Sequence, residues 1–407
     1  MTYRSALITV FWALAPGLTW AVTLSPGLYR NEAGHSMYVG IENAAPDPAV
    51  NQYFDPSTQH TGELPEHSQL KPQRLMREDA RIVDAPGGAL GTSLYFTGAA
   101  KQPTIILIHG ADQETREMGF LIPYFVLNGI NVISYDQRGT GKSSGNWLQN
   151  GPIQRAADVA AVYDAYSSSI HVDAARIGVW GFSNGGWAAP VVATTRPLAF
   201  MILRSAPASS TEDNLCYAVE QNLRRKPYDA EAIASATGTW RALIGALSGK
   251  NSWDTARDKF QAARAKPWFE SSYLSFFIPA DSPLPPAPEI ADGWRRYMIF
   301  DPTDTLSKVH TPTLALFGAL DRNVDVAHDS ALFRSAFARA GMDDFTMHIY
   351  KDAGHTLKVS TTGFNGDVSE PERLTAGYPQ IMIQWLRQRG FLAATQADSK
   401  GSRSQSK

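Results

Sequence analysis

Cysteine is almost absent from this sequence, since Cys216 is the only one in 407 residues. A single thiol excludes an intramolecular disulfide and a cysteine-based metal site. An excess of charge of either sign is also lacking, because 37 Lys and Arg residues stand against 39 Asp and Glu residues, a net charge of −2. Charge therefore does not draw the protein toward nucleic acid or an anionic membrane, and we expect a small-molecule partner.

Long hydrophobic runs are missing as well. The apolar stretch at residues 6–15 ends at Pro16, well short of the roughly 20 residues that cross a bilayer. Arg4 before this stretch and the segment Thr19–Ala21 after it match the positive start and the small-residue cleavage site of a secretory signal. We expect residues 1–21 to be the cleaved signal peptide of a periplasmic or secreted protein without stable membrane insertion; a membrane anchor is the alternative.

What the sequence does have is enough apolar and aromatic content for a large core, 43% and 11% of its positions. The order of its patterns predicts a division into several segments. From the N-terminus these are the signal peptide 1–21, a small β-rich module 22–75, an α/β domain in two parts 76–207 and 311–392, a cap or lid insertion 208–310, and a disordered tail 393–407.

The α/β domain is predicted from short runs that are apolar on both faces and alternate with amphipathic stretches, a pattern typical of parallel strands covered by helices. After a hairpin of residues 82–84 and 93–96, the expected strands are 105–108, 132–135, 177–180, 200–203, 313–317 and 346–350. The expected helices are 120–127, 153–166, 187–195, 329–340 and 378–389. The predicted fold class is therefore α/β, with a mostly parallel central sheet and a helical insertion at the edge where such folds bind ligands.

The segment Gly181–Gly185 has the pattern Gly-x-Ser-x-Gly between an expected strand and an expected helix. A serine on such a turn has strained backbone angles, and the flanking glycines let strand and helix approach each other, so that the hydroxyl projects above the sheet. Serine is also a favoured helix N-cap, which is the alternative role for Ser183. The strand before the turn and the helix after it favour a nucleophile.

A serine nucleophile needs a base to take its proton, and the base needs a third group to orient it. Asp321 follows the next-to-last expected strand and is the predicted acid, with Asp325 as the runner-up. His355 follows the last expected strand and is the predicted base. Because the carboxyl ends of parallel strands meet at one edge of a sheet, we expect both residues to converge on Ser183.

The tetrahedral intermediate of acyl transfer also needs hydrogen-bond donors for its negative oxygen, which backbone N–H groups usually supply. One predicted donor is the amide of Asn184, directly after the nucleophile. The other is the amide of Ala111, in the loop that follows the early strand 105–108. Asp112 either shapes this loop or lines the mouth of the site.

Together these motifs resemble those of the α/β-hydrolase family. The resemblance is carried over residues 81–390 by His109-Gly110, the turn Asp136–Ser143, the elbow around Ser183, the Gly-x-x-Asp-x-x-Val pattern ending at Val324, and Gly354-His355. It implies an α/β-hydrolase fold in which Ser183 is the nucleophile, Asp321 the triad acid and His355 the base, with an oxyanion hole of the Ala111 and Asn184 amides. We expect no cofactor or metal. The resemblance also implies that the insertion 208–310 is a cap, and it leaves residues 22–75 outside the shared core.

Three other classes of function are less well supported. The segment Gly139–Ser143 is similar to a phosphate-binding loop, but Asp136 stands where that motif needs a glycine, and its carboxylate would repel phosphate. A zinc enzyme would need a His-Glu-x-x-His helix, which the sequence lacks. A non-catalytic binding protein on an α/β-hydrolase scaffold is the third alternative, because a fold does not fix a function.

Among serine hydrolases, an acyl-serine intermediate serves esters and amides alike. We favour a carboxylesterase acting on a small-molecule ester, with a serine peptidase or amidase of the prolyl-oligopeptidase type as the alternative. Aromatic residues of the insertion are candidates either for an apolar substrate pocket or for the insertion's own core: Trp240, Trp253, Trp268, Phe269, Tyr273, Phe276, Phe277 and Trp294. A peptidase that captures a free amino terminus would need cap carboxylates, for which Glu212-Asp213 or the pair Asp229 and Glu231 are candidates.

Overall fold

The computed structural model describes residues 76–393 except 99, 280, 365 and 368–372, and before residue 76 it describes short strands only. These strands form an antiparallel sheet in the order β4-β3-β2-β1-β5. They are β1 (Gly27–Arg30), β2 (Ser36–Val39), β3 (Gln52–Asp55), β4 (His60–Glu63) and β5 (Lys71–Pro72). The predicted signal peptide 1–21 and the tail beyond residue 393 lie outside the described residues.

The main sheet has eight strands in the order β13-β12-β11-β10-β8-β9-β7-β6. They are β6 (Arg77–Ala85), β7 (Gly88–Phe96), β8 (Gln102–Ile108), β9 (Asn131–Tyr135), β10 (Val172–Phe182), β11 (Met201–Arg204), β12 (Thr313–Gly318) and β13 (Phe345–Tyr350). The predicted hairpin is confirmed as the antiparallel pair β6 and β7. β7 is also antiparallel to β9, and the remaining neighbours are all parallel. The sequence-based prediction of a mostly parallel sheet is therefore confirmed.

Helices cover both faces of this sheet, which explains why its central strands are apolar on both sides. One face is packed by α2 (Pro152–Ser167), α3 (Gly185–Ala193) and α10 (Val326–Ala340). The other is packed by α1 (Leu121–Leu127) and α11 (Gln380–Gln388). None of the helices in the described part of the chain is long and apolar enough to cross a bilayer.

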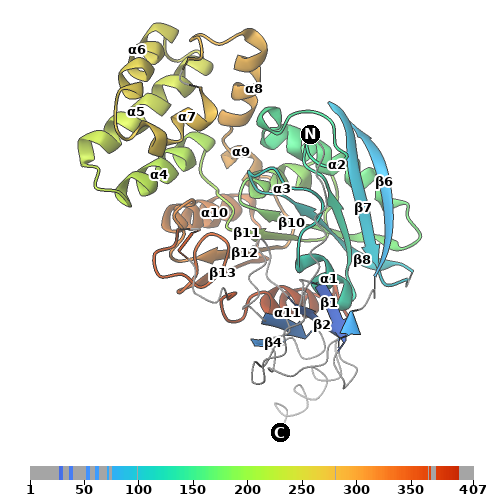
Figure 1. The fold of residues 1–407 in the computed structure, drawn as a ribbon. Coiled ribbons are helices and arrows are strands. Elements are labelled where there is room, and N and C mark those ends of the chain that lie inside the picture. The colour runs from blue at the N-terminus through green and yellow to red at the C-terminus, as the bar shows by residue number, and fades with distance from the viewer. Residues whose placement is uncertain are drawn as a thin grey trace, which may run out of the picture.

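The insertion between β11 and β12 forms a separate helical layer over one end of the sheet, drawn in yellow-green to orange in Figure 1. Its members are α4 (Thr211–Arg224), α5 (Ala230–Leu247), α6 (Trp253–Arg264), η2 (Phe269–Ser272), α7 (Leu274–Phe277) and α8 (Pro288–Met298). They enclose a core of their own, built around the fully buried Trp240. We call these helices the cap.

The cap ends earlier than the predicted boundary at residue 310. The short helix α9 (Thr303–Leu306) packs against α3 and α10, and Leu306 and Val309 are buried in the core of the main sheet. A four-residue helix gives no periodic signal in a sequence, so these residues could not be separated from the insertion by pattern alone. The chain has returned to the sheet domain well before β12 begins.

The two segments that join the cap to the sheet are hydrogen-bonded to each other and to the body. The Thr211 amide donates to the Phe300 carbonyl at 2.9 Å, across the entry and exit of the cap. The amides of Ala208 and Ser209 donate to the carboxylate of Asp329 in α10, at 2.7 and 2.6 Å. We call this group of contacts the neck; it fixes where the cap leaves the sheet.

Candidate active site

Ser183 lies in the sharp turn between β10 and α3, with a φ of 51° in the left-handed region. The glycines after it are required by close contact. A Cβ on Gly185 would lie 2.6 Å from the Ile108 carbonyl oxygen, and one on Gly186 would lie 2.1 Å from the Ala206 Cβ. The turn is thus pressed against its neighbours, and a non-glycine residue with positive φ holds the strained position.

The alternative role for Ser183, a helix cap, does not describe this turn. The N-cap of α3 is Asn184, and no side chain caps the helix through a hydrogen bond. The Ser183 hydroxyl instead faces the ring of His355.

The structure brings the three predicted triad residues into one hydrogen-bonded chain. His355 Nε2 lies 3.0 Å from Ser183 Oγ, and His355 Nδ1 lies 2.8 Å from Asp321 Oδ2. His355 and Asp321 are buried, at 4% and 3% exposure. When Nδ1–H donates to the carboxylate, Nε2 is left as the acceptor for the serine proton, which is the arrangement that a general base requires.

Asp321 is held in place by backbone donors. Its Oδ1 accepts the amides of Asn323 at 2.8 Å and Val324 at 3.0 Å, which leaves Oδ2 for the imidazole. Asp325, the runner-up, has a different task, because its side chain accepts the His328 amide and caps α10. The structure therefore pairs the histidine with the first of the two candidates.

Hydrogen bonds from Arg204, the last residue of β11, and from Ser205 hold the loop that carries His355. Ser205 Oγ donates to the His355 carbonyl at 2.7 Å, and Arg204 donates to the Thr356 carbonyl. The Arg204 guanidinium lies 4.6 Å from the Phe182 ring, whose centre lies 5.1 Å from the imidazole. These contacts restrain the ring that faces the serine, so little ordering remains to be done when a substrate binds.

The two residues of the predicted oxyanion donors, Ala111 and Asn184, line the same cavity as Ser183. Within the described part of the chain, the amides of Ala111 and Asn184 make no hydrogen bond to another protein group. Two free amides next to a nucleophile are what a developing oxyanion needs.

This cavity has a volume of about 330 Å³ and lies between the cap and the carboxyl edge of the sheet. Three of the eight aromatic residues named as candidates from the sequence line this cavity: Tyr273, Phe276 and Phe277. Trp240, Trp268, Phe269 and Trp294 are buried in the cap core, and Trp253 packs against that core. Tyr273 and Phe277 also pack against the cap core, so they both line the cavity and belong to the packing of the insertion.

The acidic residues proposed for amine capture do not line the cavity. Asp213 and Asp229 accept or share hydrogen bonds at the first turns of α4 and α5, as helix-capping acids do. Glu212 lies 3.8 Å from Arg241 on the surface, and Glu231 lies in the first turn of α5. Asp112, at the exposed rim, is the one charged residue among those that line the cavity.

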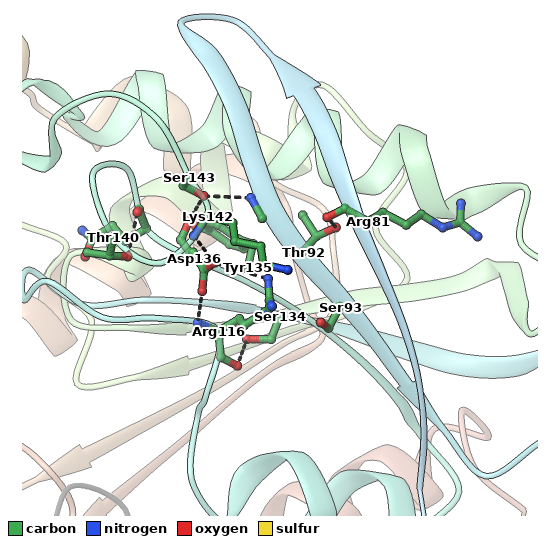
Figure 2. Close-up of polar contacts among 12 residues, drawn as sticks. Arg81, Thr92, Ser93, Arg116, Ser134, Tyr135, Asp136, Thr140, Lys142 and Ser143 are labelled. Atoms are coloured by element: carbon green, nitrogen blue, oxygen red, sulfur yellow. Dashed lines mark hydrogen bonds and ion pairs between the residues drawn. The ribbon is translucent and has the colours of Figure 1, made fainter. Parts of the chain in front are cut away.

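The turn that is similar to a phosphate-binding loop is folded around its own carboxylate. Figure 2 shows Asp136 accepting the amides of Arg116 and Lys142, each at 2.8 Å. Ser143 Oγ donates to the Asp136 carbonyl at 2.6 Å and accepts the Gly91 amide. The donors of this turn are thus used to join β7, β9 and the following loop, which supports a structural role rather than phosphate binding.

Sequence reasoning missed four polar residues that line the cavity: Thr211, Asn214, Asn323 and Tyr297, the last of them near the end of α8. The Tyr297 hydroxyl accepts a hydrogen bond from Asn184 Nδ2 at 3.1 Å, so the cap contacts the residue next to Ser183. Its neighbourhood is tightly packed, since a Cβ on Gly151 would lie 1.8 Å from the Arg296 carbonyl oxygen. No local pattern marks this tyrosine, and only the docking of α8 against the start of α2 reveals it.

No group of three or more His, Cys, Asp or Glu side chains arranged to hold a metal ion is found in the described ranges. The only cysteine, Cys216, is buried in the cap, where burial raises the pKa of its thiol to about 11.

Comparison with known proteins finds similarity to α/β-hydrolases over part of the chain. Residues 99–240 match the family model described as serine aminopeptidase, S33. A protein of Mycobacterium tuberculosis is 28% identical over 170 residues, which are 40% of this chain and 59% of that protein, so the match spans less than two thirds of the relative's length.

Solved structures that are similar to this one include an esterase of Pyrococcus furiosus and dipeptidyl peptidase 4 of Porphyromonas gingivalis. The first is 14% identical with a TM-score of 0.46, and covers 77% of this chain and 91% of its own. The second is 17% identical with a TM-score of 0.43, and covers 80% of this chain and 40% of its own. The fold and family resemblance that the motifs predict is confirmed by the family match and by the observed sheet.

Proposed function

We propose that this chain, which has the α/β-hydrolase fold, is a serine hydrolase that cleaves small carboxylic esters through an acyl-serine intermediate on Ser183. The observation that carries the proposal is the hydrogen-bonded chain from Ser183 Oγ through His355 to Asp321, at 3.0 and 2.8 Å. A non-catalytic scaffold would have no need for a strained serine, a restrained imidazole and two free amides around one cavity.

In the proposed mechanism, Ser183 Oγ attacks the ester carbonyl carbon while His355 Nε2 takes its proton. The negative oxygen that forms accepts the amides of Ala111 and Asn184. Collapse of the tetrahedral intermediate breaks the bond to the alcohol oxygen, and the alcohol leaves with the proton from His355. Asp321 stays ionised and stabilises the imidazolium.

Deacylation repeats these steps with water as the nucleophile. His355 takes a proton from the water as it attacks the acyl-serine carbonyl, and the same two amides hold the second oxyanion. The acid is released as Ser183 recovers the proton from His355. No metal or organic cofactor enters either half of this reaction.

The lining of the cavity supports an ester with apolar groups. Tyr273, Phe276, Phe277, Leu215 and Met298 form apolar walls, and Asp112 is the one charged residue among the lining residues. A volume of about 330 Å³ is near the lower end of the range for ligand pockets, which favours a small substrate.

A peptidase is the second candidate, and two observations favour it. The family model that matches residues 99–240 is described as serine aminopeptidase, and Asp112 at the rim is placed to attract a cationic amino group. Against it, the cap carboxylates that a captured amino terminus would require lie away from the cavity.

The test is a comparison of an aryl ester with an aminoacyl anilide as substrates, for the natural protein and for Ser183→Ala. We expect a higher kcat/KM for the ester, and a loss of at least about 10⁴-fold on both substrates in the variant. A clear preference for the anilide would move the assignment to a peptidase. Ester hydrolysis that survives Ser183→Ala would contradict the proposed function altogether.

A further inference from the structure

Arg155 is a buried cation that makes no direct ion pair in the described residues, although the carboxylates of Glu114 and Asp158 lie near enough to act on its charge. It belongs to α2 and is 2% exposed, and among the described residues it makes no ion pair. Its Nη2 has no hydrogen-bond partner in the same part of the chain. The nearby Arg138 is different, because it is buried in a direct ion pair with Asp158. A buried guanidinium whose hydrogen bonds go to carbonyls and not to a carboxylate is costly to desolvate, so the position of Arg155 requires an explanation.

The hydrogen bonds of Arg155 go to the loop that holds one of the proposed oxyanion donors. Its Nη1 donates to the His109 carbonyl at 2.9 Å and also to the Gly110 carbonyl. The Gly110 carbonyl and the Ala111 N–H belong to one peptide group. In a planar trans peptide the C=O and the N–H point in opposite directions. Fixing the carbonyl on Arg155 therefore aims the Ala111 N–H away from α2, and Ala111 lines the cavity.

The positive charge acts through the same peptide. A guanidinium bonded to the carbonyl oxygen polarises the peptide and strengthens the hydrogen bond that its N–H can donate. The resulting chain runs from the guanidinium through the Gly110–Ala111 peptide to an oxygen in the cavity. An oxyanion at the Ala111 amide would add a negative charge that Arg155 stabilises through this peptide, and this charge exists only during the reaction.

The loop has other anchors, so Arg155 is not needed merely to hold it in place. Both ring nitrogens of His109 face acceptors, with Nδ1 at 3.1 Å from Glu114 Oε2 and Nε2 in contact with the Tyr135 carbonyl. His109 itself is fully buried. These contacts secure the chain immediately before the peptide that Arg155 contacts.

We propose that Arg155 is a positioning residue of the oxyanion site, which orients and polarises the Gly110–Ala111 peptide so that the Ala111 amide stabilises the negative oxygen. This inference rests on the proposed function, because it assigns a role within that reaction. Arg155 does not touch the substrate and acts through the peptide alone.

The experiment uses Arg155→Met and Arg155→Lys in the full chain, with Arg138→Met as the matched control. Arg138→Met also removes a buried arginine that contacts α2, but its bonds do not reach the oxyanion loop. Active sites are counted by stoichiometric reaction with an organophosphonate, so that kcat refers to folded, reactive protein. An ester substrate gives kcat and KM, and a trifluoromethyl ketone, which forms a tetrahedral adduct with serine, gives an inhibition constant.

For Arg155→Met we expect kcat per active site to fall about 100-fold, the loss found when one oxyanion donor is removed, while KM changes less than about 3-fold. The inhibition constant of the ketone should rise by a similar factor. Arg155→Lys keeps the charge but has no planar fork, so its kcat should fall by about 10-fold. Arg138→Met should keep its kcat per active site within about 3-fold even where fewer molecules are folded.

The inference is overturned if Arg155→Lys and Arg155→Met keep their kcat per active site, or if their loss appears in KM alone. It is also overturned if ketone binding is unchanged, or if Arg138→Met loses kcat to the same extent. If Arg155→Met does not fold, kcat per active site and ketone binding of Arg155→Lys alone test the inference. A natural protein that neither hydrolyses the ester nor reacts with the phosphonate would instead contradict the proposed function, and the two failures are therefore distinguishable.

Discussion

At the residue scale, the acid of the proposed triad is oriented before any substrate binds. The Asp321 side chain is fully buried, and both of its oxygens accept hydrogen bonds. Two backbone amides donate to Oδ1, and the His355 imidazole donates to Oδ2. Asp325, four residues later, serves the first turn of α10 instead. Two neighbouring aspartates thus offer a matched pair for testing which carboxylate acts on His355.

We predict that Asp321→Asn lowers kcat by up to about 10⁴-fold, because an amide neither stabilises the imidazolium nor holds the required tautomer. Asp325→Asn should remain within about 2-fold of the natural protein, since asparagine is as good an N-cap as aspartate. Steady-state rates on one ester, with stability followed by thermal unfolding, provide the measurement. Equal losses in the two variants would argue against the assignment of Asp321.

The residues that the sequence predicted and those it missed differ in a physical way. Ser183, Asp321 and His355 each follow an apolar strand, and parallel strands carry the residues after them to one edge. Arg155 lies within an amphipathic helix, where a charged residue is expected to face solvent, and Tyr297 depends on how α8 docks. Their roles arise from contacts between distant segments, which no local pattern encodes.

At the element scale, the neck connects the cap to α10 through a single carboxylate. Asp329 is fully buried, and its Oδ1 accepts the amides of Ala208 and Ser209. Its Oδ2 has no hydrogen-bond partner in the described residues. Burial raises the pKa of this carboxyl group above its ordinary value, although the hydrogen bonds to Ser209 and Ala208 oppose the shift.

The raised pKa gives a prediction with a definite sign. The folded protein binds the Asp329 proton more tightly than the unfolded chain, so this group favours folding at low pH. Its contribution is lost as the pH rises from the ordinary aspartate value of about 4 to the raised value in the folded state. Asp329→Asn lacks this titration, and its free energy of unfolding should improve relative to the natural protein over that interval.

Urea unfolding of both proteins at a series of pH values would measure this difference. Its slope should not exceed about 1.4 kcal/mol per pH unit, the limit for one proton. A difference that is constant with pH, or that falls as the pH rises, would contradict the account of the neck.

At the scale of the whole molecule, the sheet was predictable and the arrangement of the cap was not. Strands covered by helices on both faces are short runs of apolar residues, and this pattern predicted the strands β8 to β13 from the sequence. β10 begins five residues before the predicted strand because its first part, which includes exposed Ala174 and Ala175, gives no continuous apolar run. The sequence predicted a helical cap, but which of its aromatic residues face the cavity depends on how α7 and α8 pack.

The division of the molecule into a sheet domain and a cap predicts where the substrate binds. The sheet supplies the proposed nucleophile, base and acid, whereas the cap supplies most of the cavity wall. The substrate is therefore expected to bind between the two, with its carbonyl carbon above Ser183. Reaction at that serine is the step on which every other part of the account depends.

The most direct test is covalent trapping of the nucleophile by an organophosphonate, followed by mass spectrometry of the intact protein and of its peptides. The account predicts one adduct per chain, located on Ser183, and none on the Ser183→Ala variant. An unreactive natural protein, or an adduct on a different residue, would contradict it.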